Sequence, residues 1–93
     1  MPYSVEIRDV VYEDLNEMPQ NLRVRVLRAI EQRLTTAPAQ YGVRLRQSLA
    51  GLWKLRVGDY RVIYELKGTQ VIVWAIRHRK YVYPIVERRW FRT

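Results

Sequence analysis

The chain has 93 residues with no cysteine and a single histidine, and its formal net charge at pH 7 is +8. This length predicts one domain, residues 1–93, and the lack of cysteine excludes a disulfide framework and a cysteine-ligated metal site. No signal peptide is recognisable and no apolar run approaches the roughly 20 residues of a membrane span, so a cytoplasmic protein without a membrane partner is expected. The excess positive charge favours a polyanionic partner such as a nucleic acid.

The N-terminal half predicts one strand and two helices. Apolar and polar residues alternate over residues 3–8, as they do in a half-buried strand. Asp9 is the expected N-cap of a short helix over residues 10–18, and a second helix opens at Gln20 or Asn21. The apolar stripe of the second helix repeats every four residues: Leu22, Val26, Ile30 and Leu34. Its far face carries Arg25, Arg28 and Gln32.

In the C-terminal half the apolar residues alternate, which is typical of strands. Turns at residues 58–59 and 67–68 separate three predicted strands. These strands span residues 52–57, 60–66 and 70–76. The third is almost wholly apolar, as expected of a central strand covered on both faces. A last, shorter strand over residues 81–86, limited by Pro84, is the further expectation.

Together these elements predict an α+β fold in the order β-α-α-β-β-β, with the strand over residues 81–86 as an addition. The two N-terminal helices are expected to pack on one face of a largely antiparallel sheet with four or five strands. The role of the tail, residues 86–93, is open: it is either a covering segment or an additional contact to RNA.

Three basic residues occupy the predicted hairpin: Lys54, Arg56 and Arg61. Since side chains alternate strictly along a strand, antiparallel pairing places all three on the sheet face away from the helices. The next basic segment is "IRHRKYVY", residues 76–83. If it stays extended, one side carries Arg77, Arg79, Tyr81 and Tyr83 and the other carries His78 and Lys80, but a bend would break this pattern.

A sheet face with bases and tyrosines suits RNA, because cations neutralise phosphates and a phenol ring offers a stacking plane. The alternative is a solvated face whose long side chains only cover apolar surface. The charges are nearly all of one sign, which favours the binding surface.

The sequence contains no Gly-rich phosphate loop and no nucleophile elbow, and the acids of the first predicted helix are spaced like solvent-facing positions. Metal-free cleavage of RNA remains open, because RNA supplies its own nucleophile, the 2′-OH. Arginine and lysine stabilise the charge on phosphorus, while tyrosine is a poor base unless surrounding cations favour the phenolate. Because histidine suits acid–base work near neutral pH, His78 is the rival base.

At these residues the chain resembles toxins of the RelE/ParE superfamily, from bacterial or archaeal toxin–antitoxin pairs. The resemblance covers nearly the whole chain and is carried by "NEMPQNLRVRVLRAIEQRL", "LAGLWKLRVGDYRVIYEL" and "IRHRKYVY". RelE-like members are ribosome-dependent mRNA interferases, whereas ParE-like members inhibit DNA gyrase and are not thought to cleave RNA. The presence of both Arg79 and Tyr83 favours the RelE-like branch.

The resemblance implies an mRNA endonuclease that acts in the ribosomal A site without metal or cofactor. A RelB-like antitoxin is the implied partner, in a hetero-oligomer, with the ribosome and mRNA as the targets. The implied catalytic residues are Arg61, Arg79 and Tyr83. The implied RNA contacts are Lys54, Arg56, Arg77, His78, Lys80 and Tyr81.

Two questions stay open at this level. Many relatives carry an acid where Tyr81 stands, so Tyr81 competes with Tyr83 for the role of general base, and His78 is a third contender. The alternatives to an mRNA interferase are a ParE-like gyrase inhibitor and an RNA-binding module without catalysis.

Overall fold

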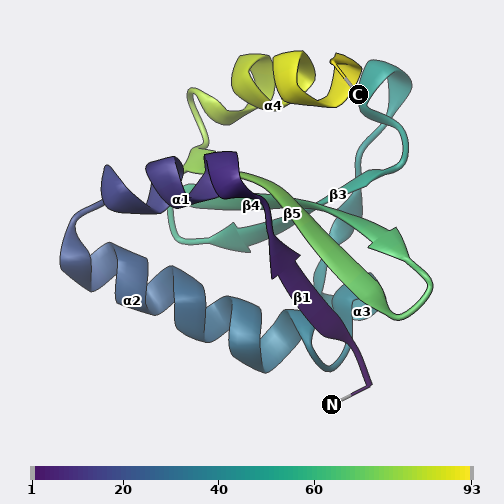
Figure 1. The fold of residues 1–93 in the computed structure, drawn as a ribbon, viewed down its shortest axis with the longest axis horizontal. Helices are drawn as coiled ribbons and strands as arrows, with labels where there is room; N and C mark the ends of the chain where they lie inside the picture. The colour runs from purple at the N-terminus through teal and green to yellow at the C-terminus, as the bar shows by residue number, and fades with distance from the viewer. Residues whose placement is uncertain (1, 93) are drawn as a thin grey trace.

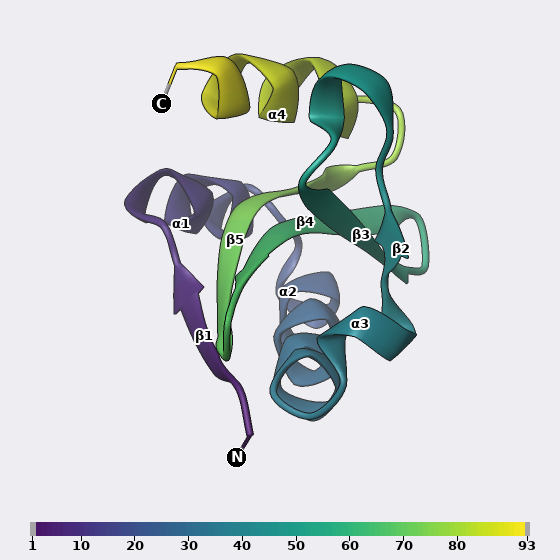
Figure 2. The same ribbon diagram turned by 90° about the vertical axis from the view of Figure 1, so that its right-hand side faces the viewer.

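The computed structural model describes residues 2–92 as an α+β fold in which a five-stranded open sheet lies between two helical layers (Figures 1 and 2). The strands are β1 (Ser4–Ile7), β2 (Val43–Arg44), β3 (Leu52–Val57), β4 (Tyr60–Lys67) and β5 (Gln70–His78). The helices are α1 (Asp9–Asn16), α2 (Gln20–Ala29), α3 (Pro38–Tyr41) and α4 (Val82–Phe91). A π-helical turn, η1 (Ile30–Leu34), continues α2, and a 3-10 turn, η2 (Gln47–Leu49), precedes β3.

The strands follow the order β1-β5-β4-β3-β2 across the sheet. β1 pairs in parallel with β5, and the other neighbours pair antiparallel. The predicted α+β class and the two helices on one face are confirmed, and β5 is an interior strand of the sheet, as expected. The fifth strand is β2, a two-residue segment, and not residues 81–86.

The predicted strand over residues 81–86 is wrong, because this segment turns and begins α4. The backbone N–H of Tyr81 donates to the carbonyl of His78 at 2.9 Å, which closes the turn after β5. Pro84 lies in the first helical turn, where its missing N–H costs no hydrogen bond. Val82 and Val86 are both buried, one helical turn apart, so the tail from Val86 to residue 92 covers the sheet.

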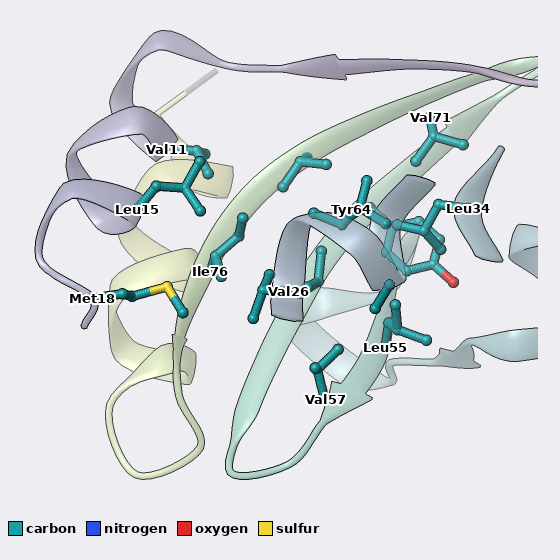
Figure 3. Close-up of a cluster of buried hydrophobic side chains, with 14 residues drawn as sticks. Val11, Leu15, Met18, Val26, Leu34, Leu55, Val57, Tyr64, Val71 and Ile76 are labelled. Atoms are coloured by element: carbon teal, nitrogen blue, oxygen red, sulfur yellow. The ribbon is translucent and has the colours of Figure 1, made fainter. Parts of the chain in front are cut away.

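The larger of two core clusters fills the space between the sheet and helices α1 and α2 (Figure 3). Val11 and Leu15 enter it from α1, Val26 from α2, and Tyr64 from the middle of β4. These residues follow the helical and strand periods of the sequence, so the amphipathic pattern accounts for this layer.

The second cluster lies on the opposite face, beneath α4, and is smaller. Its buried members are Leu49, Leu52, Ile63, Trp74, Ala75, Val82 and Val86. The rings of Trp74 and Trp90 meet edge to face with centroids 4.9 Å apart, which fixes the last turns of α4 on β5. This cluster covers only part of the face, and the hairpin end with the basic residues stays open.

A close contact between β4 and the loop after α3 yields a prediction about stability. The hydroxyl of Tyr64, which is fully buried, donates to the carbonyl of Pro38 at 2.6 Å, and burial raises the pKa of this phenol. A Cβ on Gly42 would overlap the same hydroxyl. We therefore expect Gly42→Ala to lower the free energy of unfolding by about 1–3 kcal/mol, as overpacking does.

The double variant Gly42→Ala/Tyr64→Phe provides the control in urea unfolding. Removing the hydroxyl makes room for the new methyl group, so Gly42→Ala should cost less in the Tyr64→Phe background than alone. Equal costs in both backgrounds would contradict the contact.

Candidate functional site

The open part of the sheet face carries the three basic residues of the hairpin. Arg56 pairs directly with Arg61 across β3 and β4, and Lys54 pairs with Ile63. Their neighbours Leu55, Val57 and Val62 point the other way, into the cluster beneath α2. The alternation therefore places Lys54, Arg56 and Arg61 on one face, as predicted, next to the cluster that α4 covers.

Arg61 is half-buried and held by the hairpin turn. Its Nη1 donates to the carbonyls of Gly58 at 3.0 Å and Tyr60 at 2.9 Å. A guanidinium has five N–H donors, and within residues 2–92 only those on Nη1 are engaged. The remaining donors of a fixed guanidinium suit two oxygens of one phosphate.

Arg79 lies beside the same turn although β5 has already ended. Its backbone N–H donates to the carbonyl of Asp59 at 2.8 Å. Its Nε is 3.8 Å from Asp59 Oδ1, and both side chains are exposed. An exposed, long ion pair of this kind contributes little, so the guanidinium is free to turn toward a bound anion. The structure thus brings Arg79 to the end of the sheet that holds Arg61.

Tyr83 is in the first turn of α4 and packs against the second cluster. That cluster includes Ile63, the cross-strand partner of Lys54. The ring of Tyr83 is therefore held by a helix against the face that carries Lys54, Arg56 and Arg61.

The other two contenders for the general base lie elsewhere. The ring of His78 meets Tyr60 edge to face at 5.8 Å, and Tyr60 belongs to the face beneath α2. Its Nδ1 accepts a hydrogen bond from the backbone N–H of Lys80 at 3.1 Å. Tyr81 is 62% exposed and its centroid is 6.0 Å from that of His78. The turn after β5 thus breaks the alternation expected if residues 76–83 were extended, and it separates Tyr81 and His78 from Tyr83. Lys80 is exposed in the turn itself.

Arg77 is engaged with the acids of α1. Its Nε donates to Asp14 Oδ1 at 2.8 Å and its Nη1 to Glu17 Oε2 at 2.7 Å. These ion pairs compensate much of its charge, so Arg77 has less to offer to RNA than the hairpin bases have.

Asp14 is a buried structural acid that the sequence interpretation missed, since its position was read as solvent-facing and its exposed fraction is only 1%. It lies beside β5 beyond the last paired residue of β1, Ile7, and its Oδ2 accepts from the backbone N–H of Ile76 at 3.0 Å. Arg89 of α4 donates to both carboxylate oxygens, at 2.8 and 3.0 Å, and to the carbonyl of Trp74.

One carboxylate therefore joins α1, β5 and α4. The spacing of the residues in α1 could have predicted that Asp14 is buried. Asp14 falls within the apolar stripe of Val11, Leu15 and Met18, where a solvated acid is not expected.

Within residues 2–92 no group of three or more His, Asp or Glu side chains is arranged to hold a metal ion. Among these same residues, no helix combines the length and the apolar character needed to cross a bilayer.

The fold and the site define a small basic α+β domain with a cationic sheet face beside a tyrosine on a C-terminal helix. Residues 5–83 match the family model described as the ParE toxin of type II toxin–antitoxin system, parDE. The chain belongs to this toxin family, within the RelE/ParE superfamily, and the predicted resemblance is confirmed.

Two curated relatives are toxins of Mycobacterium tuberculosis. Toxin RelG is 31% identical over 85 residues, covering 89% of this chain and 98% of the relative. Toxin RelE is 34% identical over 65 residues, covering 70% of this chain and 67% of the relative. The chain is accordingly a toxin of the RelBE type.

Solved structures show the same fold. The toxin–antitoxin complex RelBE2 of Mycobacterium tuberculosis contains a chain with a TM-score of 0.80 and 30% identity, covering 85% of this chain and 100% of that one. A mutant of the Escherichia coli toxin RelE in the free state gives a TM-score of 0.72 at 14% identity, covering 96% and 98%. The second likeness concerns the fold alone.

Proposed function

We propose that this toxin is a ribosome-dependent mRNA endonuclease that cuts mRNA in the A site by attack of the RNA's own 2′-OH. The observation that carries the proposal is the placement of Tyr83 on the face of Lys54, Arg56 and Arg61, with Arg79 at the same end. A phenol beside several cations supplies a base and a stabiliser of phosphorane charge in one place.

In the proposed reaction the phenolate of Tyr83 takes the proton of the 2′-OH, and the 2′-oxygen attacks the adjacent phosphorus. The bond from phosphorus to the 5′-oxygen breaks, which leaves a 2′,3′-cyclic phosphate, and the departing 5′-oxygen takes a proton from water. Arg61, held by the hairpin turn, faces the charge on the phosphorane, and Arg79 supports the scissile phosphate or the leaving group.

The remaining predicted RNA contacts divide between two places. Lys54 and Arg56 lie on the face of Tyr83 and orient the mRNA backbone. Lys80 and Tyr81 are exposed in the turn after β5, next to His78 and away from Tyr83. Arg77 contributes mainly through its ion pairs to α1.

A RelB-like antitoxin is the proposed partner, in a hetero-oligomer. Support comes from the RelBE2 complex and from exposed apolar side chains on the helical layer: Tyr12, Val24 and Leu27. An acidic, amphipathic segment would complement both these residues and the basic face. Coexpression with the adjacent small open reading frame is expected to restore growth, and harmless expression of the toxin alone would contradict this part.

We expect ribosome binding to weaken steeply with salt, because each neutralised phosphate releases counterions. Lys54→Ala and Arg56→Ala should each lower the affinity for ribosomes. Each should also make the slope of log affinity against log salt less steep, by about 0.7–0.9 for each lost phosphate contact. Lys67→Ala, at the opposite end of β4, is the matched control and should leave the slope unchanged. Co-sedimentation at several salt concentrations measures both, and a flat salt response of the unaltered protein would rule out the basic face as the RNA contact.

The match to a model described as a ParE toxin favours one second candidate, a gyrase inhibitor without nuclease activity. Cell-free translation followed by mapping of mRNA ends separates the two functions. An interferase gives cuts with the period of the codons, and only in translated mRNA. Intact mRNA together with inhibited supercoiling by gyrase would instead support the second candidate.

A further inference from the structure

We propose that a groove between α2 and the β3–β4 turn docks the phosphate backbone of folded ribosomal RNA, at a site separate from the one that cuts mRNA. The inference rests on the proposed function. Four arginines line this arginine groove, Arg25, Arg28, Arg33 and Arg56, and its volume is about 480 Å³. The first three belong to α2 and η1, and the fourth belongs to β3.

The charge of the groove is uncompensated. No Asp or Glu lines it, and within residues 2–92 none of its four arginines forms an ion pair. The guanidinium of Arg25 lies against the turn at Gly58, where a Cβ would come within 3.2 Å of Nη1. The guanidinium of Arg33 lies 5.8 Å from the ring centroid of Tyr41. Because like charges held together repel, a bound polyanion would stabilise this arrangement.

The lining favours a phosphate backbone over bases or a peptide. It contains no aromatic side chain, so it lacks the stacking platform on which single-stranded RNA is usually bound. Its apolar residues are Ala29 and Val57, both buried, so an amphipathic helix would find no pocket for its anchors. A lining of arginine guanidinium and glutamine amide groups suits the phosphate backbone of folded RNA, which proteins recognise by its shape and charge and not by its bases.

The spacing of the donors along α2 fits an extended ligand. Arg25, Arg28 and Gln32 recur at intervals of about one helical turn, on the far face noted in the sequence, and Arg33 follows Gln32 directly in η1. At about 1.5 Å per residue the row extends roughly 12 Å along the helix, which is long enough to meet more than one phosphate.

The groove is distinct from the cutting face, because α2 and α4 pack on opposite sides of the sheet (Figure 2). β2 pairs only with Trp53 and Lys54, so the second half of β3 is a free edge. Arg56 stands at this edge and belongs to both surfaces. Docking of folded RNA against α2 would therefore hold the toxin in place while mRNA enters on the Tyr83 side.

The test compares Arg25→Gln/Arg28→Gln with Arg46→Gln/Lys67→Gln, which removes two exposed charges outside the groove. We expect the groove variant to bind ribosomes at least about tenfold more weakly, with a salt slope lower by about one to two. Its single-turnover cleavage rate at saturating toxin should equal that of the unaltered protein, because the cutting face is intact. The control variant should match the unaltered protein in both measurements.

Equal ribosome affinity of the groove and control variants would overturn the inference. Retained ribosome affinity together with weaker binding of a purified RelB-like antitoxin would overturn it too, since the groove would then be a peptide site. A lower rate at saturation would place the arginines in catalysis and also contradict the inference. These outcomes differ from failure of the proposed function, in which the unaltered toxin cuts no mRNA on ribosomes.

Discussion

Replacement of Tyr83 by phenylalanine is expected to slow single-turnover cleavage of A-site mRNA by a factor of about 10²–10⁴. The change removes only the hydroxyl, and the ring keeps its packing against the second cluster on α4. Stacking and folding should therefore be preserved, so that the loss reports the proton transfer. The measurement uses purified ribosomes with an mRNA codon in the A site and toxin in excess.

Tyr81→Phe and His78→Gln are the matched controls for this substitution. His78 ends β5 opposite Tyr60, and Tyr81 lies in the turn that follows, so both variants should cleave within a few fold of the unaltered rate. If the Tyr83→Phe protein cleaves at the normal rate and the His78→Gln protein is inactive, the general base is His78 and not Tyr83. Normal cleavage by all three variants would show that the proton goes to another group.

Replacement of Asp14 by asparagine is expected to lower the free energy of unfolding by about 3 kcal/mol or more, as the loss of one partner of a buried ion pair does. The carboxylate accepts from the Ile76 backbone and from the guanidinium groups of Arg77 and Arg89. An amide cannot compensate two guanidinium charges, and the side chain of Arg89 is only 15% exposed. Urea unfolding followed by tryptophan fluorescence measures the difference.

Glu17→Gln is the control, because Glu17 also pairs with Arg77 but its side chain is 64% exposed. An exposed pair of this kind is worth about 1 kcal/mol or less, so the cost should be small. If Asp14→Asn and Glu17→Gln cost the same, Asp14 does not join the three elements as described. Since Arg89 and Tyr83 share α4, Asp14→Asn should also reduce cleavage by loosening the helix that positions the phenol.

The periodicity of the sequence was sufficient for most of the fold. Alternation along β3 and β4 placed Lys54, Arg56 and Arg61 on one face, because a strand leaves no other choice for residues of the same parity. The unbroken apolar run in β5 correctly predicted a strand covered on both faces. The comparisons confirm the toxin family, whereas the roles of the individual site residues stay predictions.

The failures have tertiary causes. Residues 81–86 mix β-branched and aromatic side chains with a proline, and so short a run does not distinguish a strand from the first turns of a helix. The helix is favoured because it places Val82 and Val86, which are one turn apart, on the same side, where both pack on the sheet. β2 has two residues, which is too few for any period to show.

The buried acid and the arginine groove depend on contacts across the chain. Asp14 meets Arg77 and Arg89, which lie 63 and 75 positions away, so local sequence suggested a solvent-facing carboxylate. The arginines of α2 were visible as one helix face. Their meeting with Arg56 depends on the free edge of β3, which only the sheet order defines.

The most direct test of the central claim is chemical and uses the substrate instead of the protein. A single 2′-deoxynucleotide is placed at the cut position of an mRNA in the A site of purified ribosomes, and the cleaved ends are analysed. We predict that the all-ribose mRNA is cut to a 2′,3′-cyclic phosphate and that the 2′-deoxy mRNA stays intact at that phosphate, because its nucleophile is missing. Cleavage of the 2′-deoxy mRNA at the same phosphate, or a 3′-hydroxyl product, would contradict the proposed mechanism.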